Sequence, residues 1–466
     1  MIKLHQLKFK FLLIALLFLP FINDFPLFPD SHFLRSPSYF PIIIYLFIAL
    51  ILSIYRGQLT IYFKKSSHLF ILITFIVWCF LSGLFNIDKI LDLQSINISG
   101  IGVYTKNILF LVFLFLVAYF SYSTFRCNLN IKRIKTIERI IILSFVIMAP
   151  YCILEIFAYK YENNMAISVL SFIEPFIHSR KYTELETLNV RGFSFEPSYL
   201  SLYVASVLPW IFGNTIKKNN KIKSLIILIL FLLIIILSGS RTMYLVFLIE
   251  LIVFGAIMFN ISNSKKFKKM IVLFVPLILL VSLFWENIIT VFVSLASLES
   301  TDISNITRFS SIHAALRLFI DNPVVGVGYG LAGAYLPDYY PDYAFLSYEI
   351  KDWAYARDLN LGTPVFALMP RLAAETGLIG LSLILYFWVV LIKKLYNTIK
   401  LFKNEKIIAE FGVKLLVSLI GLLVASFGVD AFTFIGYWLL FGISVGYIEN
   451  KNADYEKKDI INYIAS

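Results

Sequence analysis

The sequence predicts an all-α polytopic membrane protein, and three observations support this prediction. Of its 466 residues, 59% are hydrophobic and only 15% are charged, which is too few charges to cover the surface of a soluble protein of this size. The mean hydropathy is +0.82, so lipid is the expected solvent for most of the chain. The apolar residues also form long runs separated by short polar segments, a pattern typical of about twelve membrane-spanning helices.

A helix needs roughly 17–25 mostly apolar residues to cross the bilayer. The first apolar run follows Lys3, Lys8 and Lys10, as in a signal peptide, but Asn23 and Asp24 follow it instead of a small-residue cleavage pattern. We therefore predict a retained span there. To within several residues, the predicted spans are 9–22, 39–55, 68–85, 107–121, 138–158, 196–213, 223–238, 242–260, 270–293, 371–392, 412–428 and 431–447.

Most of the 41 Lys and Arg residues lie in alternate connections between these runs. Because positively charged connections stay in the cytoplasm, both termini are predicted to be cytoplasmic, which requires an even number of spans. The net charge of +12 is explained by these clusters, so we predict no nucleic-acid partner. Two external loops are long, 159–195 and 294–369, and long loops are commonly functional. With no internal repeat or separate soluble domain, residues 1–466 are predicted to form a single integral membrane domain.

Arginine is distributed differently from lysine in this topology. Arg binds phosphate in a bidentate way, whereas Lys acts as a point charge, so external arginines indicate an anion site; the alternative is a chance distribution. Eight of the twelve arginines lie on the external side: Arg35, Arg180, Arg191, Arg241, Arg308, Arg317, Arg357 and Arg371.

The segment RGFSFEPSYLSLY, residues 191–203, opens the sixth predicted span. Pro197 suits the first turn of a helix, which places Glu196 at the outer mouth of that span. The helix dipole favours the Glu196 carboxylate while burial disfavours it, so Glu196 is a candidate general base. The alternative is an interfacial ion pair between Glu196 and Arg191.

The turn SGSRTMY, residues 238–244, places Arg241 at the external membrane surface. A charge so close to hydrocarbon must be paired or mark a ligand site; the alternative is an Arg whose head group reaches the lipid headgroups. Farther along, PRLAAETGLIG, residues 370–380, opens another span with Arg371 and Glu375 on one helix face. This i,i+4 pair is either an ion pair or part of the site, and Gly377 and Gly380 permit close helix packing.

The segment from Thr307 to Gly330, TRFSSIHAALRLFIDNPVVGVGYG, predicts an amphipathic helix over 308–321 with Thr307 as its N-cap. Arg308 and Arg317 would lie on opposite faces of it. Since Asp321 offers Arg317 a local partner, we assign the functional role to Arg308. The GxGxG run at 326–330 follows a helix and lacks a following GK[ST], which excludes a phosphate-binding loop of that kind. A turn is predicted there, and its backbone amides could help to bind an anion.

Other chemistry-bearing residues indicate no metal or cofactor. Glu155 and Glu250 lie within spans and are second-tier candidates, because acids inside a membrane are commonly functional. The three cysteines have no metal-ligand or disulfide spacing, and the chain has only five His, with no HExxH or GxSxG motif. We therefore predict neither a metal site nor a cofactor.

Three of these segments, in order, resemble the O-antigen ligase and polymerase (Wzy-like) superfamily: SGSRT, then TRFSSIHAALRLFIDNPVVGVGYG, then LAAETGLIG. The resemblance covers roughly residues 190–392. It implies a metal-independent membrane glycosyltransferase of the GT-C type in the bacterial inner membrane. Its donor and acceptor would be undecaprenyl-pyrophosphate-linked glycans at the periplasmic face, and a chain-length regulator would be a further partner.

One departure separates the two activities within the superfamily. Ligases usually carry a His-Asn pair ahead of the AExG segment, where this chain has Phe366 and Ala367. The stretch GFSFEPSYL instead resembles a segment common in polymerases. We therefore predict an O-antigen or related polysaccharide polymerase, with an O-antigen ligase acting on lipid A core and a non-enzymatic flippase as alternatives.

The mechanism expected from the resemblance uses cations and acids at the external surface. Arg241 and Arg308 would hold the donor pyrophosphate, with Arg191 and Arg371 as further candidate ligands. The catalytic base would be Glu196 or, as the second candidate, Glu375.

Overall fold

The computed structural model describes residues 2–27, 35–55, 67–94, 99–179, 189–215, 221–261, 303–355 and 362–465. Within these ranges the chain is helical, and β pairing is limited to two isolated bridges, Ile22 with Ser194 and Gln94 with Ser99. The predicted all-α polytopic fold is therefore confirmed.

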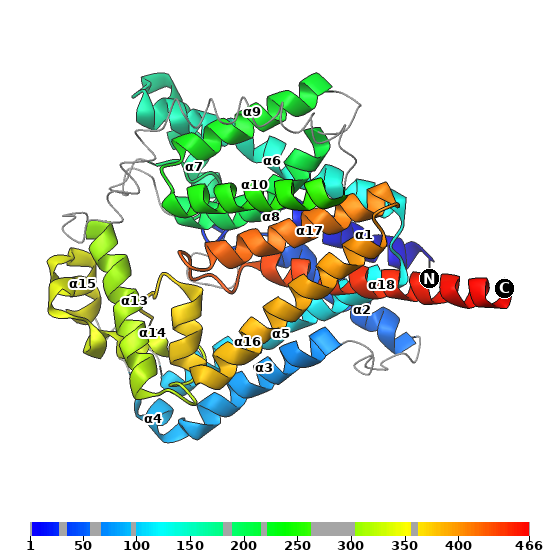
Figure 1. Ribbon diagram of the computed structural model, residues 1–466. Coiled ribbons are helices and arrows are strands. Elements are labelled where there is room, and N and C mark those ends of the chain that lie inside the picture. The colour runs from blue at the N-terminus through cyan, green and yellow to red at the C-terminus, as the bar shows by residue number, and fades with distance from the viewer. Residues whose placement is uncertain are drawn as a thin grey trace.

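Most helices belong to one elongated bundle, and each of them lies at a predicted span (Figure 1). Six of the described helices, α3, α5, α6, α10, α16 and α17, are long and apolar enough to cross a membrane. The predicted span at 270–293 lies outside the described residues. The bundle helices are α1 (Ile2–Leu17), α2 (Tyr39–Tyr55), α3 (Ser67–Phe85), α5 (Gly100–Cys127), α6 (Ile131–Lys160), α8 (Pro197–Thr215), α9 (Lys221–Leu237), α10 (Arg241–Ile261), α16 (Leu368–Leu401), α17 (Lys406–Ala425) and α18 (Ile435–Ala465).

Helix α8 lies at the centre of the bundle, and every residue from Leu200 to Gly213 is buried. It packs against α10 and α17, while α18 packs along α5 and α16 along α3. A helix that is apolar on all sides is suited to such a position, because it has no polar face to present to water. Pro197 is the first residue of α8, as predicted, so Glu196 lies directly at the N-terminus of this central helix.

A second layer of shorter helices covers one end of the bundle. It contains α13 (Ile303–Asp321), α14 (Ala332–Tyr335), the 3₁₀ helices η3 (Leu336–Tyr339) and η4 (Asp342–Leu346), and α15 (Tyr348–Tyr355). These elements share an apolar core of their own, which includes Leu318, Leu336 and Ile350. We call this layer the cap. Helix α7 (Asn164–Ile177) packs beside α6.

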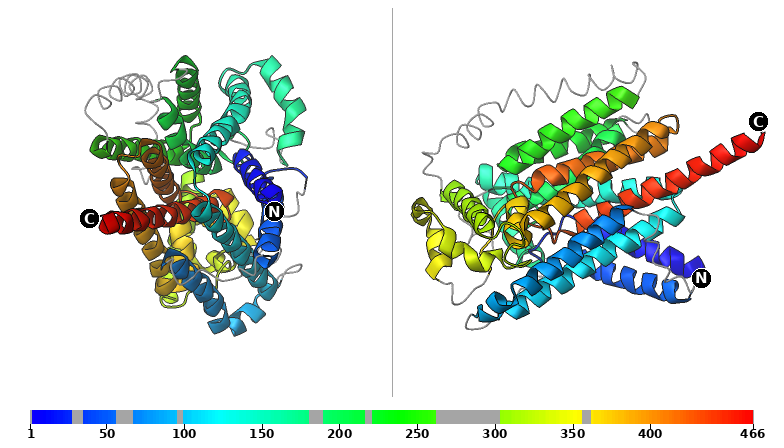
Figure 2. Two further views of the ribbon diagram at one scale, coloured as in Figure 1. Left: turned by 90° about the vertical axis from the view of Figure 1, so that its right-hand side faces the viewer. Right: turned by 60° about the horizontal axis from the view of Figure 1, so that its bottom comes forward.

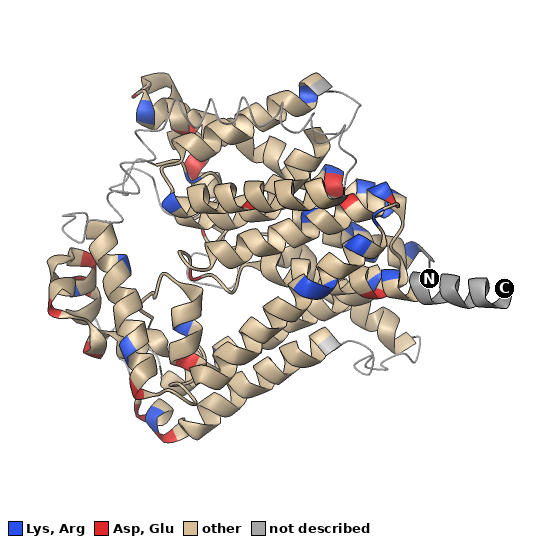
Figure 3. Cartoon of the chain, in the orientation of Figure 1, with Lys and Arg blue, Asp and Glu red and all other residues tan. Residues whose placement is uncertain are grey.

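The cap lies at one end of the bundle and both chain termini lie at the other (Figures 1 and 2). Charged residues gather mainly toward these two ends (Figure 3). Both termini therefore lie at the same end of the bundle, as an even number of spans requires. The cytoplasmic orientation of that side remains a prediction from the lysine distribution.

Two local expectations differ from the structure. Helix α13 begins at Ile303, so Thr307 is not its N-cap; its hydroxyl donates to the carbonyl oxygen of Ile303 at 2.9 Å and contacts Ser347 Oγ at 2.7 Å. Threonine inside a helix commonly bonds back to the preceding turn in this way. The second difference is at Gly377, where α16 is interrupted by a residue with φ of 65°.

Candidate functional site

Glu196 and Arg308 lie together at the end of the bundle that faces the cap. Arg308 Nη2 is 3.9 Å from Glu196 Oε2, and the two side chains are 32% and 34% exposed. Ser198 Oγ donates to the same carboxylate at 3.1 Å. A long, partly exposed ion pair contributes at most ~1 kcal/mol, so both groups can exchange this contact for one with a ligand at little cost.

Arg371 and Glu375 form a second charged group on the first turns of α16. Arg371 Nε donates to Glu375 Oε1 at 2.8 Å, which confirms the i,i+4 pairing. Its Nη1 donates to Asp430 Oδ1, also at 2.8 Å. Glu375 is buried and Asp430 nearly so. Arg371 is therefore held by two carboxylates, which fixes its direction and leaves it less available to an anion than Arg308.

Tyr199 lies near both charged groups. It lies on the first turn of α8, within electrostatic reach of Glu196, Arg308, Arg371 and Asp430. Four of the six predicted site residues, Glu196, Arg308, Arg371 and Glu375, are thus brought into one neighbourhood by α8, α13 and α16. We call this neighbourhood the charged mouth.

The glycine run at 326–330, with Pro323 before it, holds the N-terminal part of α16 in place. Gly328 N donates to the carbonyl oxygen of Glu375 at 2.9 Å, and Leu378 N donates to that of Pro323 at 2.7 Å. Gly326 has φ of 73°, and a Cβ there would lie 2.4 Å from the carbonyl carbon of Glu375. The predicted turn is therefore held against the break in α16 at Gly377. We call this contact between residues 323–330 and 375–378 the interlock, and it positions Glu375.

Arg241, the first residue of α10, donates from Nη1 to the side-chain oxygen of Asn305. Asn305 lies on α13, three residues before Arg308. This hydrogen bond links Arg241, at the start of α10, to α13, the helix that carries Arg308. Arg241 is half-buried, so part of its side chain is accessible.

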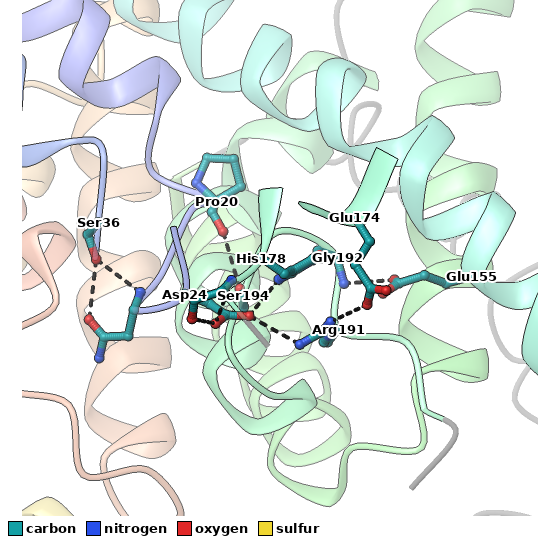
Figure 4. Close-up of polar contacts among 11 residues, drawn as sticks. Pro20, Asp24, Ser36, Glu155, Glu174, His178, Arg191, Gly192 and Ser194 are labelled. Atoms are coloured by element: carbon teal, nitrogen blue, oxygen red, sulfur yellow. Dashed lines mark hydrogen bonds and ion pairs between the residues drawn. The ribbon is translucent and has the colours of Figure 1, made fainter. Parts of the chain in front are cut away.

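Arg191, unlike Arg308, is enclosed in a buried polar network, which Figure 4 shows. It is 1% exposed, and it donates to Asp24 Oδ2 at 3.1 Å and to Glu174 Oε1 at 2.7 Å. Asp24 also contacts His178 Nδ1 at 2.7 Å. Burial lowers the pKa of His178, because desolvation disfavours the imidazolium, while the hydrogen bond to Asp24 opposes this effect. Since Arg191 is enclosed by protein carboxylates, we do not propose it as a pyrophosphate ligand.

The network around Arg191 fixes the backbone that leads to Glu196. His178 Nε2 faces the carbonyl oxygen of Gly192 at 3.0 Å, and Gly192 N donates to Glu155 Oε2 at 2.8 Å. Phe195 N donates to the carbonyl oxygen of Ile22 at 2.9 Å. Glu155, a second-tier candidate, therefore has a structural contact. Glu250, the other one, is buried against α17 near Gly421.

Phe366 stands beside the charged mouth in an unusual backbone conformation. Its φ is 62°, although its neighbours Val365 and Ala367 are each only 1% exposed. The ring lies 5.2 Å from Arg308 Cζ and 6.0 Å from the Trp353 ring. Left-handed backbone costs a bulky residue about 1–3 kcal/mol. The two ring contacts return about 1–2.5 kcal/mol, so the arrangement adds little to stability.

Sequence reasoning missed Asp430 and Asp24. Both are acids in connections between bundle helices, where a charge beside the apolar layer needs a partner; that position was the available signal. What the sequence could not show was which arginine each acid would meet. No group of His, Cys, Asp and Glu suited to a metal ion occurs within the described ranges.

These features define an all-α polytopic membrane protein with a charged site at one end of its helix bundle. Residues 226–357 match a family model described as O-antigen ligase, Wzy_C. This part of the chain, less than half of it, is therefore similar to the O-antigen ligase family. The family covers both ligases and polymerases. The matched range contains Arg241 and Arg308. A search among curated proteins found no match.

Proposed function

We propose that this protein polymerises undecaprenyl-pyrophosphate-linked repeat units into O-antigen or a related surface polysaccharide at the periplasmic face of the bacterial inner membrane. The observation that supports this most directly is the charged mouth. There the Glu196 carboxylate lies beside the loosely held Arg308 guanidinium. The superfamily match supports the reaction class.

The reaction joins two lipid-linked glycans. A hydroxyl oxygen of the acceptor sugar forms a bond with the anomeric carbon of the donor sugar, and the bond from that carbon to the pyrophosphate oxygen breaks. The leaving oxygen keeps the electron pair and departs as undecaprenyl pyrophosphate. Glu196 accepts the proton of the acceptor hydroxyl, because a carboxylate within hydrogen-bond reach can act as general base.

The arginines act on the donor. Arg308 exchanges its contact with Glu196 for the pyrophosphate, and Arg241 approaches from α10 as a second cation. Each contact with a charged group is worth ~1.5–3 kcal/mol. Such contacts favour the reaction most when they strengthen as charge develops on the leaving group. Arg371, which is held by Glu375 and Asp430, supports this arrangement. Glu375 remains the second candidate base.

A polymerase is favoured over a ligase by two sequence features. The GFSFEPSYL stretch resembles polymerases, and Phe366 stands where ligases usually carry His. A chain-length regulator is the further partner that a polymerase implies.

Glycan banding from a deletion strain tests the proposal. Loss of a polymerase leaves single repeats on the final acceptor. Loss of a ligase strands polymer on its lipid carrier, and loss of a flippase leaves no repeats outside the inner membrane. We expect single repeats, long chains on complementation with the wild-type gene, and single repeats again with Glu196→Gln at equal protein level. Stranded polymer or absent external repeats would refute the polymerase assignment.

A further inference from the structure

We propose that Phe366 and Trp353 form an aromatic platform that stacks against a sugar ring of the glycan at the charged mouth. This inference rests on the proposed function and deepens it by assigning a carbohydrate-binding surface. The two rings are 6.0 Å apart with an interplanar angle of 34°, and both are half-buried. Both residues are thus partly enclosed by their neighbours and partly accessible.

The backbone conformation of Phe366 indicates that its ring is placed beside Arg308 for function and not for stability. Val365 and Ala367 are each only 1% exposed, whereas Phe366 between them is partly exposed and has a left-handed φ of 62°. The contacts of the ring with Arg308 and Trp353 only offset the free-energy cost of this backbone conformation. Strained residues of this kind cluster at functional sites, where the surrounding structure holds them.

The chemistry around the ring suits a sugar. A pyranose has an apolar face of C–H groups and a polar edge of hydroxyls, so it needs a flat apolar surface beside polar groups. Phe366 provides that surface. The Arg308 guanidinium lies over one face of the ring, with Cζ 5.2 Å from the ring centre, and uncovers this face when it turns to the pyrophosphate. The Glu196 carboxylate is 3.9 Å beyond the Arg308 guanidinium. Aromatic surfaces with a few placed polar groups are typical of small-molecule sites.

The position relative to Glu196 identifies which part of the glycan lies there. The reacting hydroxyl must come within hydrogen-bond reach of the base. A sugar that places this hydroxyl at Glu196 extends across Arg308 toward Phe366. The platform therefore receives the acceptor sugar ring and orients its hydroxyl, which would make Phe366 a determinant of acceptor binding.

Binding measurements on purified full-length protein test this. The probe is a set of oligosaccharide fragments released by mild acid from the surface polysaccharide of the same strain, and the readout is fluorescence quenching together with saturation-transfer NMR. Phe366→Gly removes the ring and suits the left-handed backbone. We expect it to weaken binding about tenfold, equivalent to ~1.4 kcal/mol, without lowering the unfolding temperature. Phe366→Tyr and Phe366→Trp keep a ring and should bind within about threefold of wild type.

The control is Phe345→Ala, which removes an exposed aromatic ring elsewhere in the cap and should leave binding unchanged. Phe366→Asn, which also tolerates a left-handed backbone, covers the case in which the glycine variant fails to fold. Equal binding by wild type and a folded ring-less variant would overturn the proposal. Binding that depends on Phe366 in a protein whose deletion does not leave single repeats would support the platform and refute the polymerase assignment, so the two failures are distinguishable.

Discussion

At the scale of single residues, the protein uses its arginines in two different ways. Arg191 is buried and enclosed by Asp24 and Glu174 at 3.1 and 2.7 Å. Arg308 is a third exposed and meets its carboxylate only at 3.9 Å. Removing one partner of a buried pair leaves an uncompensated charge, whereas an exposed pair contributes little. Loss of a partner of Arg191 should therefore destabilise the fold, whereas Arg308 is available to a ligand.

Replacing Arg308 with Lys should impair polymerisation while the protein still inserts. The substitution keeps the charge but loses the bidentate geometry, and the loss of a contact worth ~1.5–3 kcal/mol predicts a decrease in rate of about 10–100-fold. Arg317→Lys is the matched control, since Arg317 is an exposed residue on the same helix. Chain length is measured by glycan banding. Normal chains with Arg308→Lys would contradict the proposed bidentate role.

Replacing Asp24 with Asn should destabilise the protein by ~3–5 kcal/mol, because Arg191 then keeps only one carboxylate in a buried site. The measurement is the unfolding temperature in detergent. Lys406→Ala, which removes an ion pair 3.8 Å long whose Lys is 57% exposed, should cost at most ~1 kcal/mol. A similar effect of both substitutions would show that burial does not distinguish these ion pairs.

At the scale of elements, the interlock between the glycine run and the break in α16 determines where Glu375 lies. A Cβ on Gly377 would be 2.2 Å from the carbonyl oxygen of Val324. Trp78 Nε1 donates to the carbonyl oxygen of Thr376 at 2.8 Å, and Ser82 Oγ to that of Val325 at 2.7 Å. Helix α3 therefore supports both sides of the interlock, and movement of α16 is opposed by several hydrogen bonds.

Replacing Gly377 with Ala should lower stability by ~1–3 kcal/mol, because the residue has a left-handed φ and no space for a methyl group. It should also reduce polymer length by displacing Glu375. Gly255→Ala, within the regular helix α10, serves as the control and should be neutral or stabilising by up to ~1 kcal/mol. Thermal unfolding and glycan banding measure the two effects. Unchanged unfolding and chain length with Gly377→Ala would contradict the interlock.

At the scale of the whole molecule, the cap and the chain termini lie at opposite ends of the bundle. The exposed Cys127 lies in a connection predicted to be cytoplasmic, while Cys79 and Cys152 are buried. A membrane-impermeant thiol reagent should therefore label wild-type protein in spheroplasts only after permeabilisation. In the double variant Cys127→Ser, Tyr343→Cys, labelling should occur without it, since Tyr343 is an exposed cap residue. The opposite pattern would invert the predicted orientation.

The sequence by itself determined the fold class, and it named most of the residues that we propose for the site. Long apolar runs force the backbone to satisfy its own hydrogen bonds as helices, so the positions of the described spans followed from composition alone. Short-range relations were also predictable: Pro197 begins α8, and Arg371 pairs with Glu375 one turn later.

Only the tertiary structure decided how the arginines are used. Whether a cation is buried or accessible depends on which acids approach it from distant parts of the chain. Asp24 lies 167 residues from Arg191, and Asp430 lies 59 residues from Arg371. The turn at the glycine run became an interlock for the same reason, because the groups it contacts lie on α3 and α16. Local patterns carry no information about such encounters, which are determined by how the helices pack.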